Sequence, residues 1–197
     1  MPTSVAFYVE SILLGVALAI DAFSVSMANG LNEPCMRPKK TFAIAGVFGF
    51  FQALMPLVGW ILIKTVLHWF RRLEILIPWI ALGLLGFIGV KMLYEGIKNK
   101  DSQDACTIGA KLGVGALLVQ GIATSIDALS AGLDFAGYNW IGALVASVLI
   151  GLITFALCIL GVEIGKKTGT RLDGKAGILG GIILIAIGLK IFITGWF

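Results

Sequence analysis

Two short motifs each place an aspartate in an apolar setting: AIDAFSVS at residues 19–26 and SIDALSAG at residues 125–132. An ionised carboxylate costs free energy wherever water is excluded, unless a partner compensates its charge. Asp21 and Asp127 together carry the charge that neutralises one divalent cation. The same pair could bind two protons, or one sodium ion and one proton. A purely structural role, in which both acids only join helices by hydrogen bonds, is the alternative.

Neutral oxygen atoms lie at helical spacing around each aspartate. Ser24 follows Asp21 by about one helical turn, and Asn29 lies further along the same segment. Around Asp127, side chains at intervals of three or four residues share one helix face. That face holds Gln120, Thr124, Asp127, Ala131 and Asp134. It therefore offers amide, hydroxyl and carboxylate oxygens to a ligand.

A second apolar segment contributes Gln52, which precedes Pro56 by one helical turn. Because proline has no N–H, the backbone carbonyl of Gln52 loses its helical partner and becomes available to a cation. Carboxylate, carbonyl, amide and hydroxyl oxygens suit Mg²⁺, Ca²⁺ or Mn²⁺. Met27 and Met55 lie close by in sequence. A thioether ligand would favour Mn²⁺ over Mg²⁺, although methionines in apolar helices are more often core residues.

Other kinds of site lack the residues that they need. The single histidine, His68, falls in a predicted outer loop, which argues against a zinc or copper cage. The serines beside the aspartates have no histidine to activate them. The segment GTRLDGKA at residues 169–176 lacks the Ser or Thr with which a phosphate-binding loop holds magnesium. We therefore expect neither an enzyme nor a permanently bound cofactor.

The composition places the chain in a membrane, since 58% of its residues are hydrophobic and 13% are charged. Soluble domains average about 25% charged residues. Six apolar runs are each long enough for the helix of about 20 residues that crosses a bilayer. They cover residues 7–30, 41–64, 75–97, 109–133, 138–162 and 175–196. We expect an all-α integral membrane protein with six transmembrane helices, the first of them retained rather than cleaved.

The loops differ in charge, and this difference predicts the orientation. Ten Lys and Arg residues fall in the first, third and fifth loops, whereas three fall on the other side. Loops rich in Lys and Arg remain in the cytoplasm. We therefore expect a plasma-membrane protein with both termini outside the cytoplasm. Because the basic residues serve this purpose at helix ends, we expect no nucleic-acid binding.

The chain also repeats itself, and aligning Asp21 with Asp127 aligns their surroundings. The aligned pairs are Ser24 with Ser130, Gly49 with Gly151, Gln52 with Thr154, Gly59 with Gly161, and Lys91 with Lys190. Each half holds three helices, an odd number, so the second half enters the membrane from the opposite side. The sequence predicts two inverted three-helix repeats, residues 1–100 and 101–197, whose aspartates meet near the middle of the membrane.

These residues resemble the manganese efflux pump family, MntP. The matching segments are AIDAFSVS, GFFQALMPLVGW, IATSIDALSAGL and ILGGIILIAIG, and the likeness covers nearly the whole chain. The resemblance implies export of Mn²⁺ from the cytoplasm, in a fold similar to the lysine-exporter group of small transporters. It implies Asp21 and Asp127 as the central acids, surrounded by Ser24, Ser130 and Gln52.

The chain departs from the family pattern at two positions. Some members have an acid at the position of Gln52 and another just before the LGG of the sixth helix, where this chain has Gly177. Glu163 is a candidate substitute for these acids. The favoured interpretation is that Glu163 only extends toward the membrane surface beside Lys166 and Lys167.

The main hypothesis is a secondary exporter that holds Mn²⁺ on the two aspartates and exchanges it for protons. The metal is then a substrate, and membrane lipid is the other expected partner. An exporter of a small organic cation or amino acid is one alternative, and a scaffold without transport activity is another. The sequence leaves the oligomeric state open.

Overall fold

The computed structural model describes residues 5–65, 113–169 and 176–196, together with residues 79, 82, 83, 85–91, 93, 94 and 97. Within these residues the secondary structure is helical and there is no strand. The elements are α1 (Val5–Asn32), α2 (Pro38–Thr65), α4 (Val114–Thr124), α5 (Ile126–Asp134), the short 3-10 helix η1 (Phe135–Gly137), α6 (Trp140–Gly169) and α7 (Ala176–Trp196).

Four of the spans in the described part of the chain are long and apolar enough to cross a membrane. They are Val5–Asn32, Pro38–Leu62, Val114–Gly132 and Trp140–Gly169, and a shorter apolar helix covers Ile178–Ile187. Their outer faces expose large hydrophobic side chains, such as Leu13 at 65%. Apolar surface on this scale is unfavourable in water and suits contact with lipid. The chain is a multi-pass membrane protein.

Most of the predicted segments agree with the helices. Residues 7–30 correspond to α1, 41–64 to α2 and 175–196 to α7. The segment 138–162 corresponds to α6, which continues to Gly169. The third predicted segment, 75–97, lies only partly within the described residues, of which 85–91 are helical.

The fourth predicted segment, residues 109–133, contains the apolar span Val114–Gly132, but this span is not one continuous helix. α4 ends at Thr124, Ser125 forms a turn, and α5 begins at Ile126. Residues 109–112 lie outside the described part of the chain. The interruption falls two residues before Asp127, so it changes the surroundings of that side chain.

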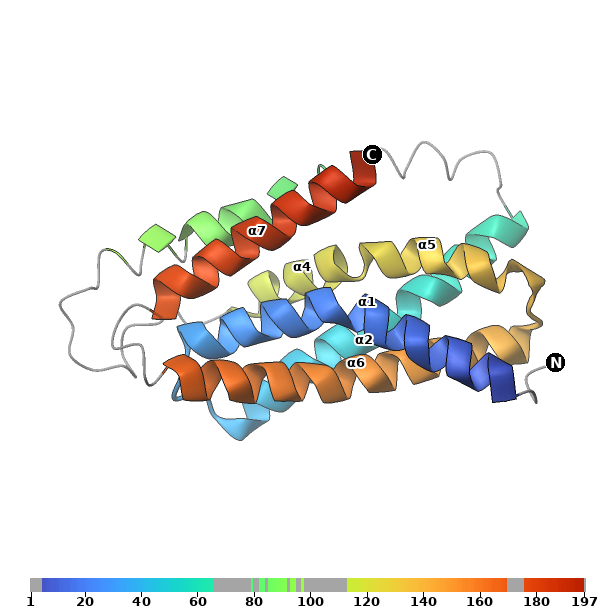
Figure 1. Ribbon diagram of the computed structural model, residues 1–197, viewed down its shortest axis with the longest axis horizontal. Coiled ribbons are helices and arrows are strands. Elements are labelled where there is room, and N and C mark those ends of the chain that lie inside the picture. Colours follow the sequence, from blue (N-terminus) through green and yellow to red (C-terminus); the bar gives the residue numbers. More distant parts are fainter. Residues whose placement is uncertain are drawn as a thin grey trace.

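α1 lies along α6 (Figure 1), and glycines allow the two backbones to approach closely. A Cβ atom added at Gly165 would lie 2.2 Å from the carbonyl oxygen of Met27. A Cβ atom at Gly30 would lie 2.3 Å from the carbonyl oxygen of Val162. Any larger side chain at either position would therefore push the helices apart.

α2 packs against both α6 and α5. Its contact with α6 is reciprocal: a Cβ at Gly49 would lie 2.8 Å from the carbonyl oxygen of Gly151, and a Cβ at Gly151 would lie 2.7 Å from that of Gly49. Near α5, a Cβ at Gly59 would lie 2.2 Å from the carbonyl oxygen of Leu129. α7 packs against α1 (Figure 1), which completes the surroundings of the first aspartate.

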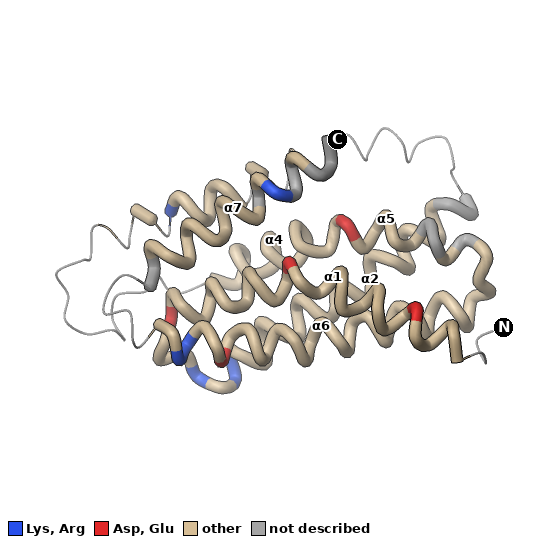
Figure 2. The backbone as a smooth tube through the Cα atoms, viewed as in Figure 1, with Lys and Arg blue, Asp and Glu red and all other residues tan. Residues whose placement is uncertain are grey.

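Charged side chains gather at the end of the bundle where α1 and α6 end and α2 begins (Figure 2). There Lys40 forms an ion pair with Glu33, and Lys166 Nζ lies 2.8 Å from Glu163 Oε1. The N-terminus of α1 lies at the opposite end (Figure 2). The assignment of this end to the cytoplasm stays a prediction from the loop charges.

Candidate metal site

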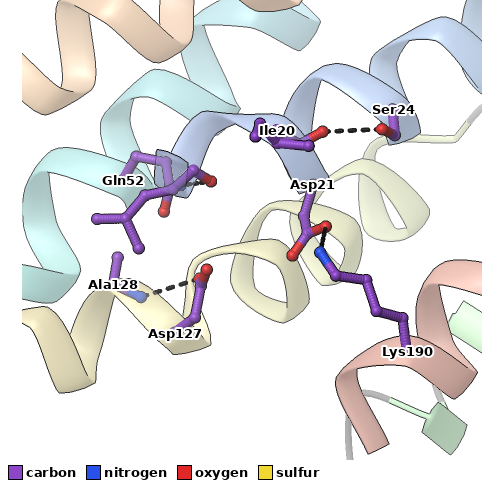
Figure 3. Close-up of polar contacts among 8 residues, drawn as sticks. Ile20, Asp21, Ser24, Gln52, Asp127, Ala128 and Lys190 are labelled. Carbon is purple, nitrogen blue, oxygen red and sulfur yellow. Dashed lines mark hydrogen bonds and ion pairs between the residues drawn. The ribbon is translucent and has the colours of Figure 1, made fainter. Parts of the chain in front are cut away.

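Asp21 lies within the continuous helix α1, and its side chain is 14% exposed. Its Oδ1 atom accepts a hydrogen bond from Lys190 Nζ on α7 at 2.8 Å (Figure 3). One turn further along α1, the Ser24 hydroxyl donates to the carbonyl oxygen of Ile20 at 2.8 Å. The Asp21 carboxylate is therefore partnered by a cation that belongs to the protein.

Asp127 lies in the first turn of α5, directly after the interruption of the helix. Its Oδ1 atom accepts a hydrogen bond from the N–H of Ala128 at 2.9 Å (Figure 3). The first turn of a helix has backbone N–H groups without helical partners and a partial positive charge. Asp127 is thus stabilised by the backbone, and among the described residues it forms no ion pair.

Two side-chain hydroxyl groups donate hydrogen bonds to backbone carbonyl oxygens near the interruption. The Ser125 hydroxyl donates to Gly121 O at 2.8 Å, and the Thr124 hydroxyl donates to Gln120 O at 2.9 Å. The Ser125 N–H bonds to Ile122 O at 3.1 Å, which gives the end of α4 a tighter turn. Such replacement of main-chain partners makes a broken helix tolerable inside a membrane.

The Asp21 carboxylate and the Lys190 ammonium form an ion pair in the region that also holds Asp127 (Figure 3). Figure 3 shows Asp21 on α1, Asp127 on α5 and Lys190 on α7. Within the described residues, no group of three or more His, Cys, Asp or Glu side chains is close enough to hold a metal. Two carboxylates with neutral oxygens are the donors that this region offers.

Gln52 is fully buried on α2. Its Nε2 atom donates to the carbonyl oxygen of Leu18 on α1 at 2.8 Å, whereas its Oε1 atom has no hydrogen-bond partner in the described structure. Thr154, aligned with Gln52 in the repeat, is also buried, and its hydroxyl oxygen likewise lacks a partner there. A buried acceptor without a partner is costly, and a cation would satisfy it.

Two other predicted ligands are partners of each other. Asn29 Nδ2 on α1 donates to Gln120 Oε1 on α4 at 2.8 Å, and Gln120 Nε2 donates back to Asn29 Oδ1 at 3.3 Å. Both side chains are buried. This amide pair joins α1 to α4 and uses the oxygens that a metal would need.

The remaining predicted residues have varied surroundings. Ser130 is exposed on α5, and Met55 packs against the apolar cluster that includes Leu18 and Trp60. Glu163 is paired with Lys166, in agreement with the favoured interpretation. The carbonyl oxygen of Met27 contacts Gly165, as described above, while its side chain is partly buried. Asp134 ends α5, and its side chain lies outside the described part of the structure.

Sequence reasoning aligned Lys190 with Lys91 but missed Lys190 as a partner of Asp21. A signal was present, because these two lysines lie inside the apolar segments while the other basic residues lie in loops or at segment ends. A charge within a membrane segment usually pairs with another. The pair of adjacent hydroxyl residues Thr124 and Ser125 was the corresponding signal for the interrupted helix.

Carboxylates on two membrane-spanning segments, one of them broken beside its carboxylate, are features of a membrane transporter that binds an ion among its helices. Comparison with known proteins agrees with this class. Residues 35–192 match the family model described as "Putative manganese efflux pump". The chain belongs to the manganese efflux pump family, MntP.

Named relatives cover nearly the whole chain. A "Putative manganese efflux pump MntP" of Clostridium botulinum (strain Loch Maree / Type A3) is 44% identical over 192 residues, which are 94% of each chain. A relative of the same name from Clostridium perfringens (strain SM101 / Type A) is 39% identical and covers 92% of each chain. One from Saccharophagus degradans is 40% identical, covering 93% of this chain and 97% of its own. No solved structure matches the chain. These relatives are named as pumps and not as enzymes.

Proposed function

We propose that this protein is a secondary transporter that exports Mn²⁺ from the cytoplasm and holds the metal between Asp21 and Asp127. The observation that carries the proposal is that these two acids, which come from helices far apart in the sequence, lie in one region of the bundle (Figure 3). Membership of the manganese efflux pump family supports the choice of metal. Two carboxylates balance the charge of one Mn²⁺ ion.

Neutral oxygens complete the proposed site. Gln52 Oε1, buried and without a described partner, is the first candidate. The hydroxyl oxygens of Ser24 and Thr124 donate to backbone carbonyls but keep lone pairs for a cation. Ser130 is exposed beside Asp127 on α5 and can turn toward a bound ion. These are hard donors of the kind that Mn²⁺ accepts.

Two inverted repeats, residues 1–100 and 101–197, are part of the proposal. Pairs of glycines aligned in the sequence make matching contacts, which supports it. Gly49 and Gly151 contact each other reciprocally across α2 and α6. Gly59 approaches the carbonyl oxygen of Leu129, and Gly161 approaches that of Phe23. Phe23 and Leu129 each follow their aspartate by two positions, so both contacts agree with one pseudo-two-fold axis.

The direction of transport requires an energy source. Moving a divalent cation outward against an inside-negative potential of 100 mV costs about 4.6 kcal/mol, at about 2.3 kcal/mol per charge. A passive channel would therefore admit Mn²⁺. Return of protons on the vacated aspartates is the simplest coupling, with the end of the bundle that holds Lys40 and Lys166 in the cytoplasm and both termini outside.

The test is Mn²⁺ flux in proteoliposomes that have an acidic lumen and contain a trapped metal-sensitive dye. Wild-type protein should accumulate Mn²⁺ as protons leave, and Asp127→Asn should abolish this flux because it removes one of the two charges. Glu10→Gln is the matched control, since Glu10 is an exposed acid on α1. Normal flux by Asp127→Asn would refute the assigned site. Absence of Mn²⁺ flux by folded wild type would favour the organic-cation exporter.

A further inference from the structure

Lys190 is a charged side chain in an unusual place. It lies within α7, which belongs to an apolar segment, and its side chain is 59% exposed. Its ammonium is nevertheless 2.8 Å from Asp21 Oδ1 on α1 (Figure 3). The Lys190 ammonium therefore contacts a carboxylate that the proposed function assigns to the metal.

We propose that Lys190 is a tethered cation that occupies the Asp21 carboxylate when no metal is bound and that Mn²⁺ must displace. This inference rests on the proposed function, because it concerns the same carboxylates. An ammonium has three donors and no lone pair, so Lys190 cannot join the metal as a ligand. A divalent ion on the same carboxylate would repel the nearby ammonium strongly. Occupation of Asp21 by Lys190 and by Mn²⁺ is thus mutually exclusive.

The geometry permits this exchange. The Lys190 side chain is more than half exposed, so it can leave Asp21 without opening a cavity in the packed core. Its flexible four-carbon stem gives the ammonium a wide range of positions. The contact of α7 with α1 also involves other residues, so loss of the ion pair leaves the helices packed.

Displacement by metal has a consequence for transport. With Lys190 in place, the empty site carries one uncompensated negative charge instead of two. This lowers the cost of the empty state within the membrane, where unpaired charge is unfavourable. It also weakens net metal binding, since the ion pair must be broken first. An exporter benefits from both effects, because it must release its substrate and return empty.

The aligned lysine of the other half provides a contrast. Lys91 lies on the third predicted segment and is exposed, and within the described structure it forms no ion pair. The aligned position in the repeat is therefore not enough to give a lysine an ion-pair partner within the described structure. Lys91→Met is the matched control for Lys190→Met, since both replace an exposed lysine in an apolar segment by an apolar side chain of similar length.

The experiment is a Mn²⁺ titration of the purified full-length protein in detergent, followed by electron paramagnetic resonance. Lys190→Met should lower the Kd of Mn²⁺ by about tenfold or more, because the competing charge-assisted hydrogen bond is absent. Lys190→Arg retains a competing cation and should keep the Kd at or above that of wild type. Lys91→Met should leave the Kd unchanged. In proteoliposomes, Lys190→Met should turn over more slowly despite its tighter binding.

The outcomes separate this inference from the proposed function. If wild type binds Mn²⁺ and Asp127→Asn binds it more weakly, but Lys190→Met has an unchanged or higher Kd, the tethered cation is refuted and the metal site stands. If folded wild type shows no saturable Mn²⁺ binding, both proposals fail. Size-exclusion chromatography checks the folding of each variant. Lys190→Gln provides a second neutral substitution with the same expected decrease in Kd.

Discussion

The two aspartate motifs are alike in sequence and differ in how the fold stabilises their charges. Asp21 lies in the unbroken helix α1 and is neutralised by Lys190 of α7. Asp127 lies in the first turn of α5 and accepts a hydrogen bond from a backbone N–H. One carboxylate has a side-chain cation as its partner, and the other lies at a helix terminus. The comparison shows that two aspartates aligned in the repeat can differ in the group that stabilises their charge.

The backbone that precedes each aspartate also differs in its polar contacts. Before Asp21, the side chain of Gln52 on α2 donates to the carbonyl oxygen of Leu18, and the helix continues. About two turns before Asp127, the hydroxyls of Thr124 and Ser125 donate to the carbonyl oxygens of Gln120 and Gly121, and the helix breaks at Ser125. In the first half a neighbouring helix provides the polar contact. In the second half the same segment of the chain provides its own.

This difference predicts unequal effects of neutralising the two acids. Asp21→Asn removes one proposed ligand and leaves Lys190 without its partner, so that its charge opposes a bound metal, and it should weaken Mn²⁺ binding by about a hundredfold or more. Asp127→Asn should weaken binding less. Adding Lys190→Met to Asp21→Asn should recover about tenfold of the affinity, and a double-mutant cycle on the purified protein measures this coupling.

The control for that cycle is Lys91→Met combined with Asp21→Asn, which should recover nothing. Equal affinities of Asp21→Asn with and without Lys190→Met would mean that Lys190 does not act on the metal. The contrast between a cation-paired and a backbone-stabilised aspartate would then have no consequence for binding.

The contacts that position the two motifs can be perturbed in the same way on each side. Gly59→Ala should drive a Cβ into the backbone of α5, where Leu129 O would lie only 2.2 Å away. Gly161→Ala would meet Phe23 O on α1 at 2.6 Å. Overpacking of this kind costs about 1–3 kcal/mol, and the closer contact at Gly59 predicts the larger loss of thermal stability in detergent.

Gly46→Ala is the control for both variants, because no atom lies within 4 Å of its added Cβ. Its melting temperature should equal or exceed that of wild type, since alanine favours a helix over glycine. Greater destabilisation by Gly161→Ala than by Gly59→Ala would contradict this order and would mean that the contact of α6 with α1 tolerates an added Cβ less than the contact of α2 with α5 does.

The sequence predicted the positions of most helices because the requirement is simple: a helix that crosses a bilayer needs about 20 apolar residues. The prediction of residues 7–30 and 41–64 therefore lies within a few residues of α1 and α2. The break at Ser125 was not predicted, because the apolar pattern continues through it. The break depends on where two hydroxyls donate, which composition does not specify.

The two aspartates were recognisable as candidates from their residue type alone, and their assignment as metal ligands stays a prediction. Their surroundings were not recognisable. Lys190 and Asp21 are 169 residues apart, and no local spacing connects them. Asn29 and Gln120 both looked like ligands, but tertiary packing makes them partners of each other. Contacts between distant segments depend on how helices pack, and a single sequence does not report that packing.

The amide pair gives the next smaller effect. Asn29→Ala and Gln120→Ala each leave one buried amide without its partner, and interhelical hydrogen bonds in membranes contribute about 0.6 kcal/mol on average. Each variant should lower the unfolding temperature slightly, and the double variant should lower it by less than the sum. The Kd of Mn²⁺ should stay the same, in contrast to Asp21→Asn. A weaker Kd for Asn29→Ala alone would restore Asn29 as a candidate ligand.

The smallest effect is expected at Glu163, where an acid in a membrane helix has a lysine partner, as Asp21 has. The pair of Glu163 with Lys166 lies at the charged end of α6, and the Glu163 side chain is 46% exposed. Exposed ion pairs contribute about 0–1 kcal/mol, so Glu163→Gln should leave both stability and proton-driven Mn²⁺ flux nearly unchanged. Lys166→Gln is the matched variant from the other side of the pair. Loss of flux in Glu163→Gln, with Lys166→Gln unaffected, would instead assign Glu163 to proton coupling, in place of the acids that some family members carry at the positions of Gln52 and Gly177.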